Sequence, residues 1–210
     1  MSTTDIDLKG KTALVTGASS GIGESLARLL ASRGADLIVV ARRADRLEAL
    51  GRELSDKHKV KVRVVAQDLA VPGAAAELFD KTEGQGQRVD LLMNNAGFGT
   101  QEFFLDIPWE RTTQEIQLNI TALTELAYRF GRAMRERKQG WLLNVASIAA
   151  YVPTSTMATY AAGKAYVLHF SQALGHELRG HGVQVTCVCP GGTVTEFQAR
   201  ANQYIGPGFG

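Results

Sequence analysis

Short apolar runs alternate with amphipathic stretches along the whole chain. The apolar runs predict six buried strands, at residues 11–16, 37–41, 60–66, 89–93, 141–145 and 183–188. The stretches between them predict helices at residues 24–33, 45–57, 74–83, 109–138 and 155–179. Strands that alternate with helices in this way are typical of a parallel sheet with right-handed crossovers and helices on both faces. The pattern therefore predicts an α/β fold, a doubly wound parallel sheet in a single domain spanning 1–210.

The longest predicted helix, 109–138, has a broad apolar face and one amide on or beside it. The apolar positions of that face are Ile116, Ile120, Leu123, Leu126, Ala127 and Phe130. The amide belongs to Asn119, and a polar side chain on a packed face needs partners. Asn119 is therefore either a satisfied core residue or part of a polar site.

Composition and charge narrow the class of protein. The chain has 210 residues, 45% hydrophobic and 21% charged, which is ordinary for one globular domain. The net charge of +2 is too small to indicate a nucleic-acid partner. The densest basic cluster, at 132–138, falls at a predicted helix end, where cations complement the helix dipole and are solvated.

Targeting and metal-binding signals are weak. Residues 1–11 lack the apolar core of a signal peptide, and no apolar run approaches the ~20 residues that span a bilayer, so we expect a cytoplasmic protein with no membrane partner. Cys187 and Cys189 lie two apart on one predicted strand, which is poor geometry for a disulfide. The four histidines form no ligand cluster, and we expect no metal site.

A glycine-rich turn connects the first predicted strand to the first helix. Residues 16–23 read TGASSGIG, in the strand–loop–helix context of a dinucleotide-phosphate site. Gly17 allows a tight turn, and Gly21 and Gly23 let backbone amides and the helix N-terminus approach a pyrophosphate. Glycine-rich turns are also often only turns, and the motif alone leaves that alternative open.

Arginines follow the second predicted strand, where an acidic residue often binds the adenosine ribose. Arg42 and Arg43 can pair with a 2′-phosphate that an acid would repel, so NADP(H) is favoured over NAD(H). Both arginines could instead be solvated at a loop start, an alternative that has most weight for Arg43. After the third strand, Asp68 either accepts a hydrogen bond from the adenine amino group or starts a turn.

Polar or glycine residues follow every predicted strand. Gly17, Arg42, Asp68, Asn94, Ser147 and Pro190 stand at successive strand ends. In a doubly wound sheet the carboxyl ends of the strands form the edge where ligands bind. The small and amide residues of 94–97 would let a ribose lie flat against the backbone there.

A tyrosine and a lysine in the last predicted helix carry the candidate chemistry. Tyr160 and Lys164 are four residues apart and share one helix face. A nearby ammonium favours the phenolate and would lower the tyrosine pKa from about 10, which makes Tyr160 a candidate general acid/base. Ser147 could hydrogen-bond the same reacting oxygen. The alternative is that Tyr160 packs in the core and Lys164 is solvated.

Together these motifs resemble the short-chain dehydrogenase/reductase family over about 8–197. The matches are the glycine motif at 16–23, the NNAG at 94–97, the set Asn119, Ser147, Tyr160 and Lys164, the Pro190-Gly191 pair and the threonine Thr195. The resemblance implies a Rossmann fold and hydride transfer between nicotinamide and a substrate carbon. It implies that Tyr160 exchanges the proton, Ser147 orients the oxygen and Lys164 lowers the Tyr160 pKa and holds the nicotinamide ribose. It also implies that Asn119 supports a water relay.

The cofactor is expected to lie along the strand ends. The residues expected to bind it are Gly17, Ser19, Ser20, Gly21, Ile22, Gly23, Arg42, Arg43, Asp68, Leu69, Asn95, Ala96, Gly97, Tyr160, Lys164, Pro190, Gly191, Thr193 and Thr195.

Three departures from the family pattern matter. Gly163 replaces the more usual Ser or Ala, and a glycine in a helix costs about 1 kcal/mol of stability relative to Ala. Ser20 stands where NADP-using members often carry a basic residue, so the NADP preference rests on the arginines. Only nineteen residues follow Gly191, whereas the family continues through a substrate-covering segment, a seventh strand and a last helix. We therefore expect an incomplete substrate pocket, an apolar edge strand at 183–188, and self-association. The resemblance also implies a homodimer or homotetramer that uses the two long helices, 109–138 and 155–179.

These observations favour an NADP(H)-dependent carbonyl reductase or alcohol dehydrogenase acting on a small molecule. The segments 98–108, 149–156 and 193–210 mix apolar and small residues and favour an apolar substrate. A dinucleotide-binding sensor or interaction protein without turnover is the alternative. An extended-family epimerase or dehydratase fits less well, because it needs a TGxxGxxG motif and a longer chain.

Overall fold

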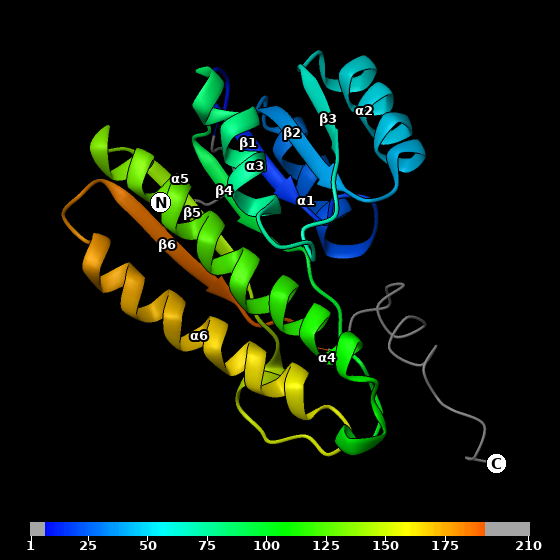
Figure 1. Ribbon diagram of the computed structural model, residues 1–210. Coiled ribbons are helices and arrows are strands. Elements are labelled where there is room, and N and C mark those ends of the chain that lie inside the picture. The colour runs from blue at the N-terminus through cyan, green and yellow to red at the C-terminus, as the bar shows by residue number, and fades with distance from the viewer. Residues whose placement is uncertain (1–6, 192–210) are drawn as a thin grey trace.

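A six-stranded parallel sheet forms the centre of the molecule. The computed structural model describes residues 7–191 (Figure 1). The strands are β1 (Thr12–Thr16), β2 (Asp36–Ala41), β3 (Val62–Ala66), β4 (Leu91–Asn94), β5 (Gly140–Val145) and β6 (Val183–Val188). Their order is β3-β2-β1-β4-β5-β6, with every pairing parallel. The chain starts in the middle of the sheet, winds outward to β3 and returns to β4, so the switch point lies between β1 and β4. The predicted doubly wound fold is confirmed.

Helices cover the sheet from both sides. They are α1 (Gly21–Ser32), α2 (Ala44–His58), α3 (Ala74–Lys81), α4 (Trp109–Ile116), α5 (Leu123–Glu136) and α6 (Ala158–Leu178). Alternate strand residues enter different cores: Leu14 of β1 packs with α3, α5 and α6, whereas its neighbours Ala13 and Val15 pack with α1 and α2. This alternation follows from the period-two geometry of a strand and makes the first five strands largely apolar on both sides.

The long helix predicted at 109–138 is continuous but not regular. A π-helical segment, Gln117–Ala122, separates α4 from α5. The predicted apolar face is correct along α5, but Ile116 is 36% exposed while Thr112 and Glu115 are buried. A π turn contains an extra residue, so it rotates the face of α4 relative to that of α5. The prediction for Ile116 is wrong for this reason, and α4 presents polar side chains inward.

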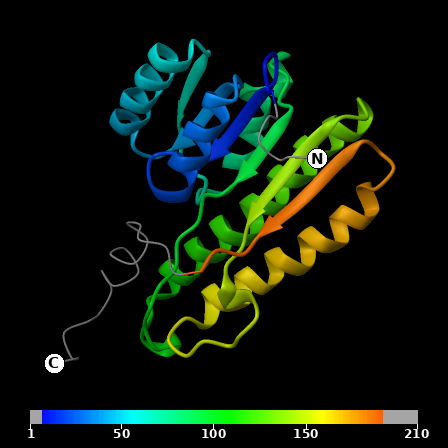
Figure 2. The same ribbon diagram turned by 180° about the vertical axis from the view of Figure 1, so that it is seen from behind.

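Strand β6 is an edge of the sheet within the described residues. Its apolar residues Val183 and Val185 belong to the core beneath α6, whereas Gln184 and Thr186 face outward and are exposed. Figure 2 shows this side of β5 and β6 without a covering helix from residues 7–191. Within residues 7–191 no strand pairs with its outer edge, and the outward side chains near its centre are polar; self-association stays a prediction.

Two further findings concern the described residues. None of their helices combines the length and apolarity needed to cross a membrane. Cys187 and Cys189 are both free, and no group of three or more His, Cys, Asp or Glu side chains between residues 7 and 191 could hold a metal ion.

Candidate active site

The glycine-rich turn leads from β1 into α1 and is closely packed. Gly17 and Gly21 adopt φ values of +69° and +58°, which favour glycine. A Cβ added at Gly23 would lie 2.3 Å from the carbonyl oxygen of Gly17. Ser20 precedes the first turn of α1 but makes no side-chain capping hydrogen bond, so it leaves the N–H groups of that turn available. This arrangement fits a pyrophosphate, whose charge the helix N-terminus favours.

A strand-end threonine fastens this turn to the end of β4. The hydroxyl of Thr16 accepts hydrogen bonds from the backbone N–H groups of Asn95 (3.0 Å) and Ala96 (2.9 Å) and donates to the carbonyl of Met93 (3.2 Å). The Asn95 side chain donates back to the Thr16 carbonyl at 2.9 Å. Thr16 was not singled out from the sequence, although a hydroxyl at the last position of a buried strand was the available signal.

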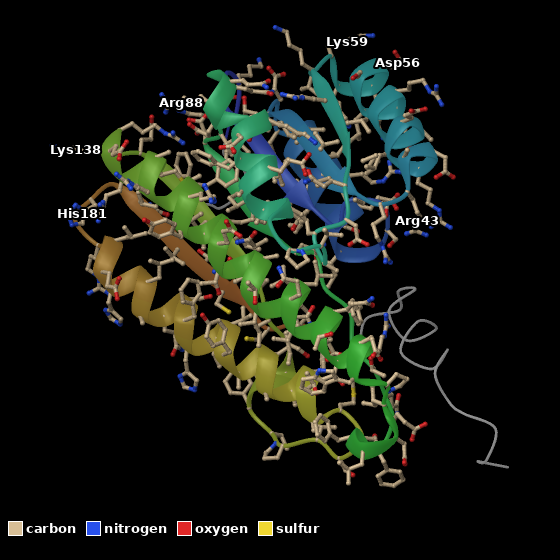
Figure 3. The ribbon with its side chains drawn as sticks, in the orientation of Figure 1. Arg43, Asp56, Lys59, Arg88, Lys138 and His181 are labelled. Carbon is tan, nitrogen blue, oxygen red and sulfur yellow. The ribbon has the colours of Figure 1, made fainter. Side chains whose placement is uncertain are left out.

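The two arginines after β2 have different environments. Arg43 is partly buried, and its Nη2 donates to Ser19 Oγ (3.1 Å) and to the Ser19 carbonyl (3.2 Å). Figure 3 shows Arg43 at the N-terminal end of α2, with Asp56 and Lys59 at the other end of that helix. Arg42 is exposed and forms a loose ion pair, with Nη1 3.7 Å from Asp68 Oδ2. The solvated alternative is therefore wrong for Arg43, which supports the glycine-rich turn.

The loop after β3 contains the next two predicted cofactor residues. Asp68 Oδ1 accepts a hydrogen bond from the Ala70 backbone at 2.9 Å, so Asp68 does start a turn. The side chain of Leu69 is buried in the core with α3 and α5. Leu69 therefore has only its backbone left to offer a ligand.

Ser147 and Tyr160 come together from β5 and α6. Ser147 follows β5 and opens a 3-10 turn, Ile148–Ala150, by accepting a hydrogen bond from the Ala149 N–H at 3.2 Å. Tyr160 lies in the first turn of α6 and is 8% exposed, and Ser147 is near enough to its phenol to lower the pKa of that group against the rise that burial causes. The Ile148 N–H donates to the Pro190 carbonyl at 3.0 Å, which brings the chain after β6 to the same place.

Lys164 is buried rather than solvated. It is 5% exposed, and its Nζ donates to the carbonyl of Val145 at 2.7 Å and lies 5.6 Å from the centroid of the Tyr160 ring. Burial lowers the pKa of Lys164 to about 8, while the charges of Cys187, Cys189 and Glu115 act in the opposite direction. The alternative of a core tyrosine beside a solvated lysine is therefore wrong for the lysine.

The electrostatics of Tyr160 differ from the expectation. The sequence predicts a pKa lowered by Lys164; in the structure burial raises the pKa of Tyr160, the hydrogen bond with Ser147 lowers it and the charge of Glu115 raises it further. The helical spacing places the lysine correctly but does not include the cost of burying both groups. Lys164 also directs a hydrogen bond at a backbone carbonyl, away from the phenol.

Asn119 satisfies both interpretations given for it. It lies in the π-helical segment, its Oδ1 accepts from the Phe98 N–H at 3.1 Å and its Nδ2 donates to the Phe98 carbonyl at 2.7 Å. A Cβ added at the neighbouring Gly97 would lie 2.9 Å from Asn119 Oδ1 and 3.6 Å from Lys164 Nζ. Asn119 is thus a satisfied buried amide that also borders the space beside Lys164.

Most of the predicted site residues lie along one edge of the sheet. Ile22 is partly exposed at the start of α1, and Gly191 lies just beyond Pro190. Thr193 and Thr195 lie outside the described residues. One buried acidic residue near Tyr160, Glu115, was not predicted, although its position one turn before Asn119 was visible in the sequence.

Comparison with known proteins defines the family. The family model described as short chain dehydrogenase matches residues 11–205. The chain belongs to the short-chain dehydrogenase/reductase family.

Individual relatives are longer than this chain. An uncharacterized oxidoreductase of Myxococcus xanthus is 36% identical over 93% of the chain and 77% of its own length. A short-chain dehydrogenase from Sphingobium yanoikuyae, solved in complex with NADPH, has a TM-score of 0.87 and 38% identity over 91% of this chain and 74% of that one. The bulky-bulky ketone specific alcohol dehydrogenase from Comamonas testosteroni has a TM-score of 0.83 and 35% identity over 87% of this chain and 72% of that one.

Proposed function

We propose that the protein is an NADP(H)-dependent oxidoreductase that moves a hydride between nicotinamide and a carbonyl or secondary alcohol, with Tyr160 as general acid/base. The observation that carries the proposal is the buried side chain of Tyr160, with Ser147 near its phenol and Lys164 Nζ 5.6 Å from its ring, at the sheet edge that holds the glycine-rich turn. The membership of the chain in an oxidoreductase family supports it.

The side chains divide the work around one oxygen. Bound nicotinamide supplies or accepts the hydride. Tyr160 gives a proton to the carbonyl oxygen during reduction and removes it during oxidation, and Ser147 donates a hydrogen bond to the same oxygen. A phenol whose pKa is raised by burial keeps its proton at neutral pH, which suits the reduction direction.

Lys164 and Asn119 act next to the reacting oxygen. The Lys164 ammonium borders the space above Gly97, where it would hold the nicotinamide ribose. Asn119 fixes the backbone at Phe98, and we assign it the support of a water relay to Lys164.

The glycine-rich turn and the arginines are the proposed cofactor site. The pyrophosphate would lie against Gly17, Ser20, Ile22 and Gly23, and the riboses against 95–97 and Pro190-Gly191. Arg42 is exposed and, among the described residues, forms a loose 3.7 Å ion pair with Asp68, so it could turn toward a 2′-phosphate, and Arg43 already lies on Ser19. NADP(H) is therefore the proposed cofactor over NAD(H).

We assign a bulky apolar ketone or its alcohol as the substrate class. Ile148, Tyr151 and Val152 follow Ser147 and are between 56% and 64% exposed, so an apolar surface lies beside the proton donor. The ketone specificity of the related Comamonas enzyme supports the same class. Exposed aromatics on the outer sides of α5 and α6, Tyr128 and Tyr166, support a homodimer or homotetramer.

The decisive test replaces the phenol and leaves its volume. Tyr160→Phe should lower kcat for reduction of aryl and alkyl ketones by about 10²-fold or more, because it removes the proton donor. NADPH binding, followed by fluorescence titration, should be retained. Tyr166→Phe is the matched control, because Tyr166 lies on the same helix, is exposed, and its hydroxyl forms a hydrogen bond with Thr124 at 3.0 Å. A Tyr160→Phe protein with near-normal kcat would refute the role of Tyr160, and NADPH binding without turnover of any ketone by the unmodified protein would favour the sensor alternative.

A further inference from the structure

A buried carboxyl group lies close to Tyr160 and Lys164 and has no role in the reaction as described above. Glu115, near the end of α4, is only 2% exposed, and its Oε1 is enclosed without a hydrogen-bond partner among the described residues. Acidic side chains are seldom buried unless they are paired, and leaving one carboxyl oxygen unsatisfied costs free energy. The position therefore requires an explanation beyond packing.

The neighbours of Glu115 on its own helix contact the loop that borders the site. Arg111, one turn earlier, donates from Nε to Thr100 Oγ1 at 3.3 Å and stacks over the Phe98 ring at 3.8 Å. Asn119, one turn later, holds both backbone groups of Phe98. Burial raises the pKa of the Glu115 carboxyl and Thr100 of the same loop lowers it, so the carboxyl lies near this loop. The carboxyl thus lies between an outer arginine and the inner amide.

The charge of Glu115 also reaches the reacting pair. Helix α4 packs against α6, and the carboxylate raises the pKa of Tyr160 and opposes the burial-induced fall in the pKa of Lys164. Burial raises the pKa of Glu115, and Thr100, Arg111 and Lys164 lower it. Among residues 7–191, the charged or titratable groups around it are therefore Arg111 from α4 and Tyr160 and Lys164 from α6. Cys187 in β6 and Cys189 just after it raise the pKa of Lys164.

We propose that Glu115 is a positioning residue for this reaction, whose buried carboxylate keeps the Tyr160 phenol and the Lys164 ammonium protonated. The inference rests on the proposed function, because it assigns Glu115 to the proton chemistry of Tyr160. An anion disfavours a neighbouring phenolate and favours a neighbouring ammonium. In the reduction direction Tyr160 must hold its proton, so the carboxylate extends the active range toward higher pH.

The test removes the charge and keeps the shape. Glu115→Gln retains the length and the hydrogen-bonding capacity toward Thr100. Glu115→Asp retains the charge, and Glu110→Gln is the matched control, because Glu110 is an exposed carboxylate on the same helix. For each protein, kcat for ketone reduction is measured against pH at saturating NADPH. Phenolate formation at Tyr160 is measured as the ultraviolet difference between each protein and its Tyr160→Phe counterpart.

The expected result is that the high-pH limb of the kcat profile moves in Glu115→Gln. In Glu115→Gln the loss of activity at high pH and the appearance of the Tyr160 phenolate should both move to lower pH, whereas Glu115→Asp and Glu110→Gln should keep both in place. At acidic pH the wild-type carboxyl is itself protonated and carries no charge, so the wild-type and Gln profiles should converge there.

A uniform fall in kcat with an unmoved pH profile and an unmoved phenolate titration would overturn the proposal and leave Glu115 with a structural role in holding Thr100. The phenolate titration needs no turnover, so it tests Glu115 even if Tyr160→Phe shows that the proposed function is wrong. Should Glu115→Gln fail to fold in thermal melts, Thr100→Val provides the second test. It removes a hydroxyl that lowers the pKa of Glu115, so Glu115 should stay protonated up to a higher pH than in the wild type. The effect of the uncharged carboxyl on kcat and on the phenolate titration should therefore extend to that higher pH. Profiles identical to those of the wild type would refute the proposal.

Discussion

The two halves of the sheet edge differ in what forms the candidate site: backbone groups in one half and side chains in the other. Around β1 and β2 the site consists of backbone: glycines at positive φ, uncapped helix N–H groups and a turn held by Thr16, with arginines at the rim. Around β4, β5 and α6 it consists of buried side chains from distant segments, among them Asn119, Tyr160 and Lys164. A backbone site depends on local sequence, whereas a side-chain site depends on what surrounds each group after folding. We therefore propose that the first half binds the cofactor through its shape and that the second half acts through shifted proton affinities.

The sharpest way to break this contrast is to add one methyl group to the backbone half. Gly23→Ala places a Cβ 2.3 Å from the Gly17 carbonyl oxygen, a contact with backbone that cannot swing aside. We expect a loss of about 3 kcal/mol in the free energy of unfolding and failure to bind NADPH. Urea denaturation and fluorescence titration measure the two effects. Normal binding by Gly23→Ala would show that the turn has room to spare and that its shape is not decisive.

How far the sequence predicts the molecule follows the same division. The six strands, the glycine-rich turn and the joining of Ser147, Tyr160 and Lys164 follow from local patterns and from the rule that strand ends share one edge. The inward turn of Glu115 does not, because it depends on the π-helical segment that rotates α4. Nor does the raised pKa of Tyr160, because burial is a property of the folded surroundings rather than of a four-residue spacing.

The rim of the backbone half offers a smaller and more selective change. Arg42→Asp converts an attraction for the 2′-phosphate into repulsion, so NADPH binding should weaken by about 10- to 100-fold while NADH binding changes little. Arg52→Asp, an equal charge change at an exposed site on α2, is the control. Fluorescence titration with both cofactors gives the answer. Equal losses for NADH and NADPH would remove the basis for an NADP(H) preference.

The smallest expected effect is a gain, and it comes from a glycine in the other half. Gly163 is buried in the second turn of α6 between Tyr160 and Lys164, yet a Cβ there would meet only Ile120 atoms at 3.7 Å, an ordinary van der Waals distance. Its φ does not require glycine, unlike that of Gly17. Gly163→Ala should therefore stabilise the protein by about 0.5–1 kcal/mol, because alanine loses less backbone entropy in a helix. Kcat should stay within twofold, since the added methyl contacts Ile120 and leaves the phenol and ammonium in place. A lower melting temperature would mean that the backbone at Gly163 has no room for a methyl group. The two halves of the sheet edge would then not differ in how closely their backbones are packed.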